Sequence, residues 1–296
     1  MSVAGLAPPD AEAMDRVVRV ALAEDLGAGG DLTTRAIVAP DLCGTVLLVS
    51  RRPGVLAGLC VFSAVFSALS PEIVVTSLVP DGRPIGPGEV LARVSGPVAP
   101  ILTGERTALN FAGHLSGIAT LTARFLETVA GTGAIIRDTR KTTPGLRVLE
   151  RYAVRCGGGH NHRDGLWDAL LIKDNHIAAD GSLTQAVARA RRMAPTMGLE
   201  VEVESIEGVR EALACGVELI LLDNFDLPAI GEAVALCRGR ARTEASGGIT
   251  LDNAGAIARL GVDFLAIGAL THSAPALDLG LDVELVDSGG GHAAHN

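Results

Sequence analysis

Apolar residues recur at helical spacing over residues 9–27, which end at a glycine, and this pattern predicts a helix near the start of the chain. Residues 27–38 contain several glycines and are interpreted as a turn that leads into an extended segment. Residues 44–49 and 73–79 are apolar or alternate with polar residues, as half-buried strands do. The chain therefore begins as a mixture of helix and strand.

The following segments complete a small domain. Residues 79–100 are rich in turn-forming Gly and Pro and contain one short strand. A helical pattern resumes over residues 103–129 and is broken near Gly113 and Gly117. Short turns between strands favour an antiparallel sheet. We therefore predict a small α+β domain over residues 1–117.

After Gly133 the pattern changes to a regular alternation of short apolar strands and amphipathic helices. The predicted strands end in polar or charged residues, and they are AIIRDTR, ALLIKDN, LEVEVES, LILLDNF, RTEASGG and FLAIGAL. The predicted helices lie near residues 182–194, 206–215, 227–237 and 251–260. Repeated βα units with polar strand ends favour a complete or incomplete α/β barrel over residues 118–276. The alternative, a doubly wound open sheet, would gather its site at one switch point.

Composition narrows the classes of function. The 296 residues are 48% hydrophobic but only 3% aromatic, which suits small aliphatic side chains packed between helices and a parallel sheet. A formal net charge of −9 argues against nucleic acid or an anionic membrane surface as the main partner. Residues 54–70 are uncharged but fall short of a membrane span and contain Gly and Ser. We interpret them as a buried strand followed by a buried helix.

Cysteines and the chain ends indicate the compartment. The five cysteines are scattered and include no Cys-x-x-Cys pair, which indicates reduced thiols. The first residues show no basic stretch followed by an apolar one, so we expect no signal peptide and a cytoplasmic location. The final segment, DSGGGHAAHN, is expected to be disordered.

One short stretch of this acidic chain is strongly basic. Its cationic residues and histidines are Arg140, Lys141, Arg147, Arg151, Arg155, His160, His162 and Arg163. Such a local cluster indicates a site for a small, strongly negative ligand. Arginine forks match carboxylates with two parallel hydrogen bonds, whereas lysine acts as a point charge. Lys173 directly follows the apolar strand ALLI and is expected at the same site.

Two strand ends of the predicted barrel carry small residues. Ser246, Gly247 and Gly248 precede a predicted helix, and Gly268 and Ala269 follow the next strand. Glycines let backbone N–H groups approach an anion, and a helix N-terminus adds its dipole. We interpret this pair of turns as a phosphate-binding site. The alternative is two ordinary turns.

Glu202 and Asp223 end neighbouring predicted strands. Carboxylate oxygens at such positions can hold Mg²⁺ that is shared with the phosphates of a substrate. Alternatively, Lys141 and Lys173 neutralise the two carboxylates. The two interpretations are compatible, because a metal–phosphate ligand would lie among all four side chains.

Three other kinds of chemistry use residue types found here. Lys173 could form a Schiff base, as in aldolase-type barrels, but the many neighbouring cations and the phosphate-binding glycines disfavour this. Cys156 near His160 could be a thiol nucleophile, although a buried, inert cysteine is the commoner case. His160, His162 and His176 could bind zinc, but no thiolate joins them and their neighbours are Arg and Lys.

Several motifs together resemble one family. They are DTRKTTPGLRVLERYAVRCGGGHNHRDGLWDALLIKDNH, VEVES, LLDNF, EASGGI and GAL, with ALAEDLGAGGDLTT and GERTALNFAGHLSGIAT nearer the start. This set resembles the quinolinate phosphoribosyltransferases, the nicotinate-nucleotide pyrophosphorylases of NAD biosynthesis. The likeness spans about residues 20–286, and its central motif is long and specific.

The resemblance implies an N-terminal α+β sandwich-like domain and an incomplete α/β barrel. Residues 277–296 are a candidate segment to pack back on the N-terminal domain. It implies a homodimer in which the N-terminal domain of one subunit covers the barrel mouth of its partner, with a higher oligomer left open. It also implies quinolinate and phosphoribosyl pyrophosphate as substrates and Mg²⁺ as cofactor. The products would be nicotinate mononucleotide, pyrophosphate and CO₂.

The resemblance further implies roles for individual residues. Those that bind quinolinate are Arg140, His162, Arg163 and Lys173, with Arg106 reaching the site of the neighbouring subunit. Those that act in catalysis are Lys141, Lys173, Glu202 and Asp223, of which the two carboxylates also hold the metal. Those that bind the 5′-phosphate are Ser246, Gly247, Gly248, Gly268 and Ala269. Either Arg51 or Arg52 is a further candidate for the site.

Two other functions stay open at this point. One is a related phosphoribosyltransferase that acts on another acid, such as nicotinate. The other is a non-enzymatic module that binds a phosphorylated metabolite. The presence of Lys141, Lys173, Glu202 and Asp223 disfavours the second.

Overall fold

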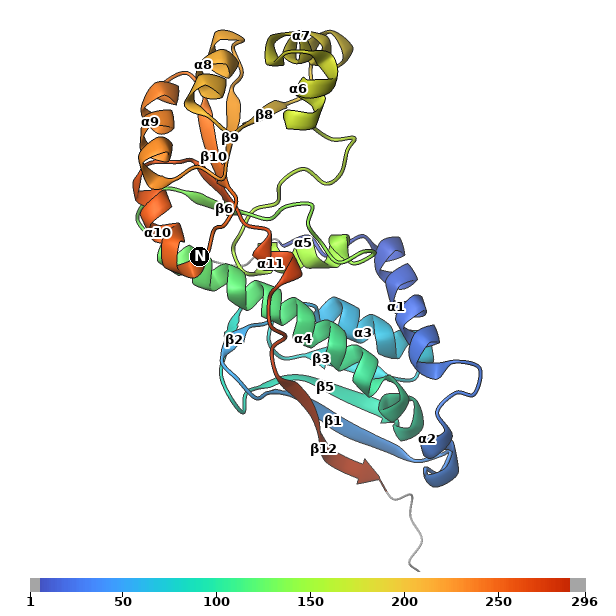
Figure 1. Ribbon diagram of the computed structural model, residues 1–296. Helices are drawn as coiled ribbons and strands as arrows, with labels where there is room; N and C mark the ends of the chain where they lie inside the picture. Colours follow the sequence, from blue (N-terminus) through green and yellow to red (C-terminus); the bar gives the residue numbers. More distant parts are fainter. Residues whose placement is uncertain (1–5, 288–296) are drawn as a thin grey trace, which may run out of the picture. The chain divides into compact units, whose positions relative to one another are not determined.

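The computed structural model describes residues 6–287 (Figure 1), and its internal contacts divide the chain into two compact units. Unit 1 comprises the described residues of Met1–Leu121, Thr143–Gly157 and Ala274–Asn296. Unit 2 comprises Thr122–Thr142 and Gly158–Ser273. The domain boundary after residue 117 stays a prediction, and the division by contacts assigns residues 143–157 to unit 1.

The helices and strands of both units follow here with their bounds. The helices among the described residues are α1 (Ala11–Leu26), α2 (Leu32–Ile37), α3 (Leu59–Leu69), α4 (Val98–Thr128), α5 (Arg147–Cys156), α6 (Asp174–Asp180), α7 (Leu183–Met193), α8 (Ile206–Ala214), α9 (Leu227–Cys237), α10 (Leu251–Arg259) and α11 (Ala269–His272). The strands among these residues are β1 (Cys43–Ser50), β2 (Gly54–Val55), β3 (Val74–Ser77), β4 (Pro84–Ile85), β5 (Val90–Pro97), β6 (Ile135–Arg137), β7 (Leu170–Ile172), β8 (Leu199–Val203), β9 (Leu219–Asp223), β10 (Arg242–Ser246), β11 (Phe264–Ala266) and β12 (Leu279–Asp287).

Aspartate caps begin the first two helices. The Asp10 carboxylate accepts a backbone N–H of the first turn of α1 at 2.8 Å, and α1 ends at Gly27, whose φ of 50° suits glycine. The first predicted helix is confirmed. The extended segment predicted after it is wrong, because the Asp31 carboxylate accepts a hydrogen bond from the Thr34 N–H at 2.9 Å and starts α2.

Unit 1 contains an antiparallel sheet with the strand order β12-β1-β5-β3, as predicted for this part of the chain. The strands predicted over residues 44–49 and 73–79 and within residues 79–100 correspond to β1, β3 and β5. Figure 1 shows α3 and α4 over one face of this sheet. β12, from the end of the chain, pairs with the whole of β1. The disorder predicted for residues 287–296 concerns a segment that, except for Asp287, lies outside the described residues.

The uncharged segment of residues 54–70 forms β2 and α3, as predicted. Phe62 and Phe66 of α3 are fully buried, and their rings meet edge to face with centroids 5.1 Å apart. Burial inside unit 1 therefore explains why residues 54–70 include no charged side chain. Among the described residues, none of the helices combines the length and the apolar character that a membrane crossing needs.

The long helix α4 runs without a break, so the interruption predicted near Gly113 and Gly117 is wrong. These glycines instead make room for the backbone that precedes β12. A Cβ atom at Gly117 would lie 2.1 Å from the carbonyl oxygen of Pro275, and one at Gly113 would lie 2.9 Å from that of Leu277. The Leu277 N–H donates to the Gly113 carbonyl at 2.8 Å. Close backbone approach, rather than helix breaking, explains both glycines.

Unit 2 contains a parallel sheet of six strands among the described residues, in the order β6-β11-β10-β9-β8-β7 (Figure 1). The first strand of the unit therefore lies beside the last, as in a barrel, and not in the centre, as in a doubly wound sheet. β6 and β7 lie at the two ends of this order, and the outer edge of β6 forms a parallel bridge with His160. The helices α7, α8, α9 and α10 occupy the predicted positions between strands. The incomplete α/β barrel is confirmed.

The close approach of α4 to Pro275 generates a stability prediction. A methyl group at residue 117 would overlap the Pro275 carbonyl, so the helix or its neighbour must shift. We expect Gly117→Ala to lower the free energy of unfolding by about 1–3 kcal/mol, the usual cost of overpacking. Urea denaturation followed by circular dichroism measures this.

The matched control is Gly231→Ala in α9, where the nearest atom to the new methyl would be 3.8 Å away. Alanine is the better helix former, so this change should stabilise by up to about 1 kcal/mol. Equal effects of the two substitutions would contradict the close approach.

Candidate active site

A pocket of about 560 Å³ lies in unit 2 and is lined by residues at or just after the carboxyl ends of the strands. Of the residues predicted to form the site, those that line it are Arg140, Lys141, His162, Arg163, Lys173, Glu202, Asp223, Ser246, Gly247, Gly248, Gly268 and Ala269. The parallel strands thus bring together side chains that are far apart in the sequence. Arg106 belongs to unit 1 and is not part of this lining.

The pocket receives only part of the basic stretch. Arg140, Lys141, His162 and Arg163 line it. The remaining arginines of the stretch lie on α5 in unit 1, where the Arg155 guanidinium donates to the Ala7 carbonyl at 3.2 Å. These arginines are not part of the pocket lining.

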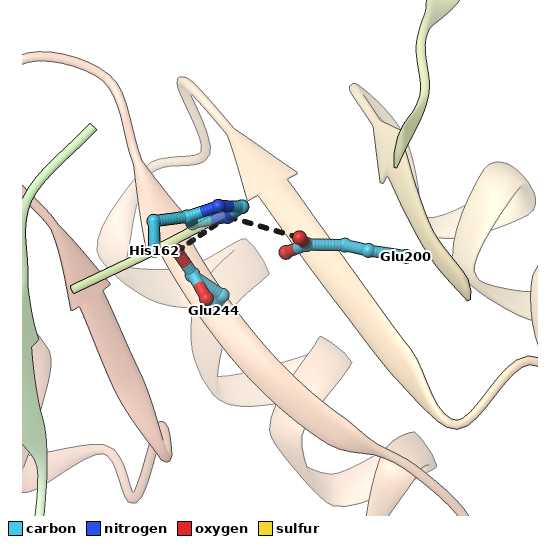
Figure 2. A group of neighbouring side chains, drawn as sticks. All are labelled: His162, Glu200 and Glu244. Carbon is cyan, nitrogen blue, oxygen red and sulfur yellow. Dashed lines mark ion pairs between the residues drawn. The ribbon is translucent and has the colours of Figure 1, made fainter. Parts of the chain in front are cut away.

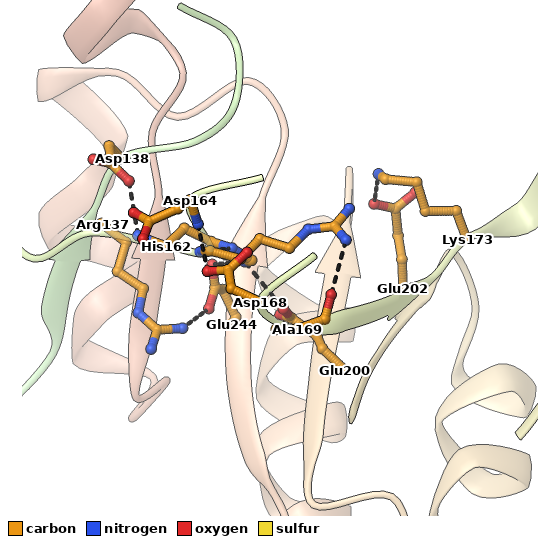
Figure 3. Close-up of polar contacts among 11 residues, drawn as sticks. Arg137, Asp138, His162, Asp164, Asp168, Ala169, Lys173, Glu200, Glu202 and Glu244 are labelled. Carbon is orange, nitrogen blue, oxygen red and sulfur yellow. Dashed lines mark hydrogen bonds and ion pairs between the residues drawn. The ribbon is translucent and has the colours of Figure 1, made fainter. Parts of the chain in front are cut away.

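Lys173 follows β7 at the pocket and pairs with the carboxylate of Glu202 on the neighbouring strand β8 (Figure 3). Schiff-base chemistry needs an amine that is free to attack a carbonyl, whereas the Lys173 side chain is engaged in this ion pair. Lys173 is therefore suited to attract an anion. The partner carboxylate is available to a second cation on its other oxygen.

Two turns in the pocket expose backbone in the way an anion-binding site requires. Gly247 and Gly248 have φ values of 89° and 59°, and α10 begins just after them with Thr250 as its cap. A Cβ atom at Gly247 would lie 2.1 Å from the Asn224 side-chain oxygen, so only glycine fits. At Gly268 a Cβ atom would lie 3.2 Å from the Lys141 side chain. The glycines keep this part of the pocket free for a ligand.

Four connected side chains form what we call the floor cluster: Arg137, His162, Glu200 and Glu244 (Figure 3), of which Figure 2 shows the last three. His162 also lines the pocket, and the other three are not part of the lining. His162 Nε2 lies 3.0 Å from a carboxylate oxygen of Glu200 and 3.5 Å from one of Glu244. The Arg137 guanidinium donates to the other oxygen of Glu244 at 2.6 Å and lies over the Phe264 ring. Glu244 is fully buried and Glu200 nearly so. The cluster joins β6, β8 and β10.

Sequence reasoning placed His162 at the site, but it did not predict that His162 joins Arg137, Glu200 and Glu244 in a cluster, although a signal for the two carboxylates exists. Glu200 and Glu244 stand two positions before Glu202 and Ser246, which line the pocket. Side chains two apart on a strand face the same side, so these carboxylates lie about 7 Å deeper along the same face. A glutamate inside an apolar strand, two residues before a site residue, is the sequence feature that indicates such a buried carboxylate.

The separations within the floor cluster would admit a metal ion, since the possible ligand atoms of His162, Glu200 and Glu244 lie within 4.8 Å of one another. Arg137, however, already neutralises Glu244, and a metal cation there would repel the guanidinium. We assign no ion to this cluster.

Hydrogen bonds fix the loop that carries His162 and Arg163 (Figure 3). The Asp138 carboxylate accepts from the His162 backbone N–H at 2.7 Å. The Arg163 N–H donates to His162 Nδ1 at 2.7 Å, and the Arg163 guanidinium donates to the Ala169 carbonyl at 3.1 Å. Both ring nitrogens of His162 therefore have protein partners. A ligand contact through either nitrogen would have to replace one of them, so the substrate-binding role of His162 stays a prediction.

Two pKa shifts describe the floor cluster. Burial lowers the pKa of His162, but the hydrogen bond to Glu200 and the charges of Glu244 and Glu200 outweigh it and raise the pKa above its ordinary value. Burial and the Glu200 charge raise the pKa of Glu244 to about 7, against the opposite influence of His162 and Arg137. Both shifts favour a proton held within the cluster near neutral pH.

Comparison with known proteins assigns this arrangement to a family. The family model described as quinolinate phosphoribosyl transferase, C-terminal domain, matches residues 118–282, and the model of the N-terminal domain matches residues 31–116. The chain belongs to the quinolinate phosphoribosyltransferase family. The resemblance inferred from the sequence motifs is thus confirmed.

Relatives and solved structures agree with this membership. The chain is 48% identical to the nicotinate-nucleotide pyrophosphorylase [carboxylating] of Mycobacterium leprae, over 90% of this chain and 95% of the relative. It is 42% identical to NadC from Streptococcus pyogenes, with a TM-score of 0.89 over 94% of this chain and 99% of that structure. For the nicotinate-nucleotide pyrophosphorylase of Francisella tularensis the identity is 39% and the TM-score 0.87, over 92% and 96% of the two chains.

Two alternatives weighed from the sequence lose support in this quinolinate phosphoribosyltransferase family member. Cys156 is buried on α5 in unit 1, where burial and the Asp81 charge raise the pKa of its thiol to about 12, so the nucleophilic thiolate is disfavoured. His176 accepts the Lys173 N–H at 3.0 Å and caps α6. Within residues 6–287, the three histidines considered for zinc do not form a ligand group together.

Arg106 of the quinolinate phosphoribosyltransferase chain lies on α4 and lines a second pocket, of about 670 Å³, in unit 1. This pocket has mixed character: Arg16 and Glu24 contribute charge, and Phe111 contributes an apolar surface. His114, which also lines it, contacts the buried Glu150 carboxylate through Nε2 at 2.9 Å. Arg106 thus occupies a formed surface of unit 1.

Proposed function

We propose that the chain transfers phosphoribosyl from phosphoribosyl pyrophosphate to quinolinate, with loss of CO₂, and so produces nicotinate mononucleotide and pyrophosphate. The observation that carries the proposal is one pocket that combines a cation group with glycine turns suited to phosphate. Membership of the quinolinate phosphoribosyltransferase family supports the same reaction.

Quinolinate carries two adjacent carboxylates and needs more than one cation. Arg140, Arg163 and Lys173 line the pocket and would bind these carboxylates and fix the ring. The ring nitrogen then attacks C1 of the ribose as the bond from C1 to pyrophosphate breaks. Positive charge develops at C1, where Glu202 or Asp223 would stabilise it. Lys141 would stabilise the departing pyrophosphate.

Loss of CO₂ follows from the first step. Once the ring nitrogen is alkylated, the pyridinium can accept the electron pair left when the bond between C2 and its carboxylate breaks. A proton then adds at C2, and nicotinate mononucleotide results. The protein need only position this carboxylate and keep it out of bulk water.

Mg²⁺ remains the proposed cofactor. Glu202 and Asp223 end the adjacent strands β8 and β9 and offer carboxylate oxygens, the donors that Mg²⁺ prefers. When bound, the ion would neutralise negative charge on the pyrophosphate group. The Lys173–Glu202 pair is compatible with this role, because a carboxylate has two oxygens for two cations.

A product assay tests the proposed function. The chain is incubated with phosphoribosyl pyrophosphate, Mg²⁺ and either quinolinate or nicotinate, and chromatography follows the mononucleotide and pyrophosphate. We expect turnover with quinolinate and none with nicotinate, because the pocket offers more cations than one carboxylate needs. A Lys141→Ala chain purified in parallel controls for contaminating activity.

The same assay decides the alternatives. Equal turnover of the two acids would contradict the assignment to quinolinate and favour a transferase with another substrate. Binding of phosphoribosyl pyrophosphate without pyrophosphate release from either acid would favour a non-enzymatic binding module.

The arginine geometry generates a second prediction. A guanidinium can grip a planar carboxylate through two parallel hydrogen bonds and fix its rotation, whereas an ammonium cannot. We expect Arg140→Lys and Arg163→Lys each to lower kcat/KM for quinolinate on the order of 10²-fold, the effect of a misplacement of about 1 Å. Steady-state kinetics measures this.

Affinity for phosphoribosyl pyrophosphate, measured by calorimetry, should change much less in both variants. Arg210→Lys is the matched control, because Arg210 pairs with Glu232 on the exposed surface of unit 2. Near-normal quinolinate turnover in both pocket variants would mean that these arginines provide charge alone.

We also propose a homodimer in which Arg106 serves the site of the partner subunit. Arg106 lies in unit 1, outside the pocket of unit 2, and lines a pocket of its own with partly apolar walls. A partner subunit is the occupant that the family resemblance implies. A higher oligomer and the cytoplasmic location stay predictions.

Subunit mixing tests the shared site. Arg106→Ala and Lys173→Ala chains are each expected to be inactive. In a mixed dimer one site has both defects and the other has neither, so statistical exchange should restore about a quarter of wild-type activity. Differently tagged chains verify the exchange. Complete exchange without recovery of activity would rule out this arrangement.

A further inference from the structure

The floor cluster contains more negative than positive charge unless it holds a proton. Glu200 and Glu244 contribute two carboxylates and Arg137 contributes one guanidinium, so a neutral His162 leaves one uncompensated negative charge. His162 Nδ1 already accepts the Arg163 N–H, so the imidazole has no free site for a second proton, and one proton on Glu244 makes the cluster neutral. Glu244 has none of its side-chain surface exposed, and Glu200 is also buried, so the unprotonated cluster would carry its charge at a high energetic cost.

The hydrogen bonds of the cluster leave room for this proton. Among the described residues, Oε1 of Glu200 and Oε1 of Glu244 are buried without a hydrogen-bond partner. Oε1 of Glu244 is also the oxygen that lies 3.5 Å from His162 Nε2. A protonated carboxyl at this position can donate a hydrogen bond, whereas a bare carboxylate oxygen there lacks a donor.

The cluster also lies where its charge can act on a ligand. His162 lines the pocket, and Glu244 is two residues before Ser246 of the pocket lining on β10. Arg163, which follows His162 in the loop, lines the same pocket. A negative cluster would oppose a ligand with two carboxylates, and a neutral one would not.

We propose that Glu244 of the floor cluster must hold a proton for quinolinate to bind, so that binding of this dianion takes up a proton from solvent at alkaline pH. The inference rests on the proposed function, since quinolinate is the ligand. Glu244 is then a positioning and charge-setting residue that acts through His162, not a group that touches the substrate.

The direction of the linkage follows from the groups that face Glu244. They are Arg137 from β6, Glu200 from β8 and His162 from the loop, and Phe264 of β11 is apolar. With the pKa of Glu244 near 7, the free protein keeps the proton below this pH and loses it above. A bound dianion raises the pKa further. Proton uptake on binding is therefore small at pH 6 and larger at pH 8.

If the four side chains had a purely structural role, the expected result would differ. A salt-bridge network that only holds the strands would change stability when mutated, but it would not exchange protons when a ligand binds. Proton uptake therefore separates the two roles.

Calorimetry of the full chain tests the proposal. Quinolinate is titrated at pH 6 and at pH 8 in pairs of buffers with different ionisation enthalpies, and the difference in heat gives the protons taken up per quinolinate. We expect uptake approaching one proton at pH 8 and little at pH 6. In steady-state assays, KM for quinolinate should rise by up to about tenfold per pH unit above the pKa of the cluster, with kcat much less affected.

Glu244→Gln is the decisive variant, because its amide keeps the shape and removes the titrating charge. We expect the uptake at pH 8 to disappear and KM for quinolinate to become nearly independent of pH. Glu200→Gln, which also makes the cluster neutral, gives a second route if the first variant folds poorly. The matched control is Glu232→Gln, which removes a carboxylate from an exposed arginine pair and should leave uptake unchanged.

The outcomes are distinct. Quinolinate binding or turnover at pH 8 without proton uptake overturns the inference alone. Undiminished uptake in both glutamine variants also overturns it, because the proton then goes elsewhere, for example to His272 of the pocket lining. A chain that neither binds nor turns over quinolinate at either pH overturns the proposed function, and this inference with it.

Discussion

The register of hydrogen bonds between six parallel strands decides where each charged group of unit 2 lies. On β10 and β9, Ser246 pairs with Asp223, so the phosphate-binding turn and the acidic strand end finish at the same level. A shift of one residue on a strand would exchange its two faces. Glu200 and Glu244 would then point away from the interior, and Val201 and Ala245 would replace them. The pocket and its floor therefore depend on the same backbone pairing.

Opposite charges occur at different depths of this interior. The residues that line the pocket include Arg140, Arg163 and Lys173, which suit an anionic ligand. Behind them, buried carboxylates pair with Arg137 and His162. The Lys173–Glu202 pair adds a carboxylate to the lining itself, across neighbouring strands. A pocket rich in cations is more tolerable in a folded protein when carboxylates lie close behind it, since like charges otherwise repel.

Much of this organisation could be predicted from the sequence, because it follows from local patterns. Alternating βα units favoured a barrel over a doubly wound sheet, and polar strand ends such as Asp223 marked the side on which a pocket forms. Features that depend on contacts distant in sequence could not be predicted. Glycine is a poor helix former, so Gly117 was expected to interrupt the helix, but in the structure it allows close approach of the Pro275 backbone. This contact could not be predicted, because Pro275 is more than 150 residues away in the chain. Likewise, the sequence does not show that Glu244 forms an ion pair with Arg137, because the two residues are distant in the chain and lie on different strands.

The pairing of β12 with β1 has a consequence for how the protein is made. β1 leaves the ribosome more than 200 residues before β12, the strand that covers its outer edge. The whole of unit 2 lies between them in the sequence, so it can fold while unit 1 still lacks an edge strand. During that interval the unpaired N–H and C=O groups along β1 are open to pairing with another nascent chain. Emergence of β12 from the ribosome therefore both completes the sheet of unit 1 and closes a site of aggregation.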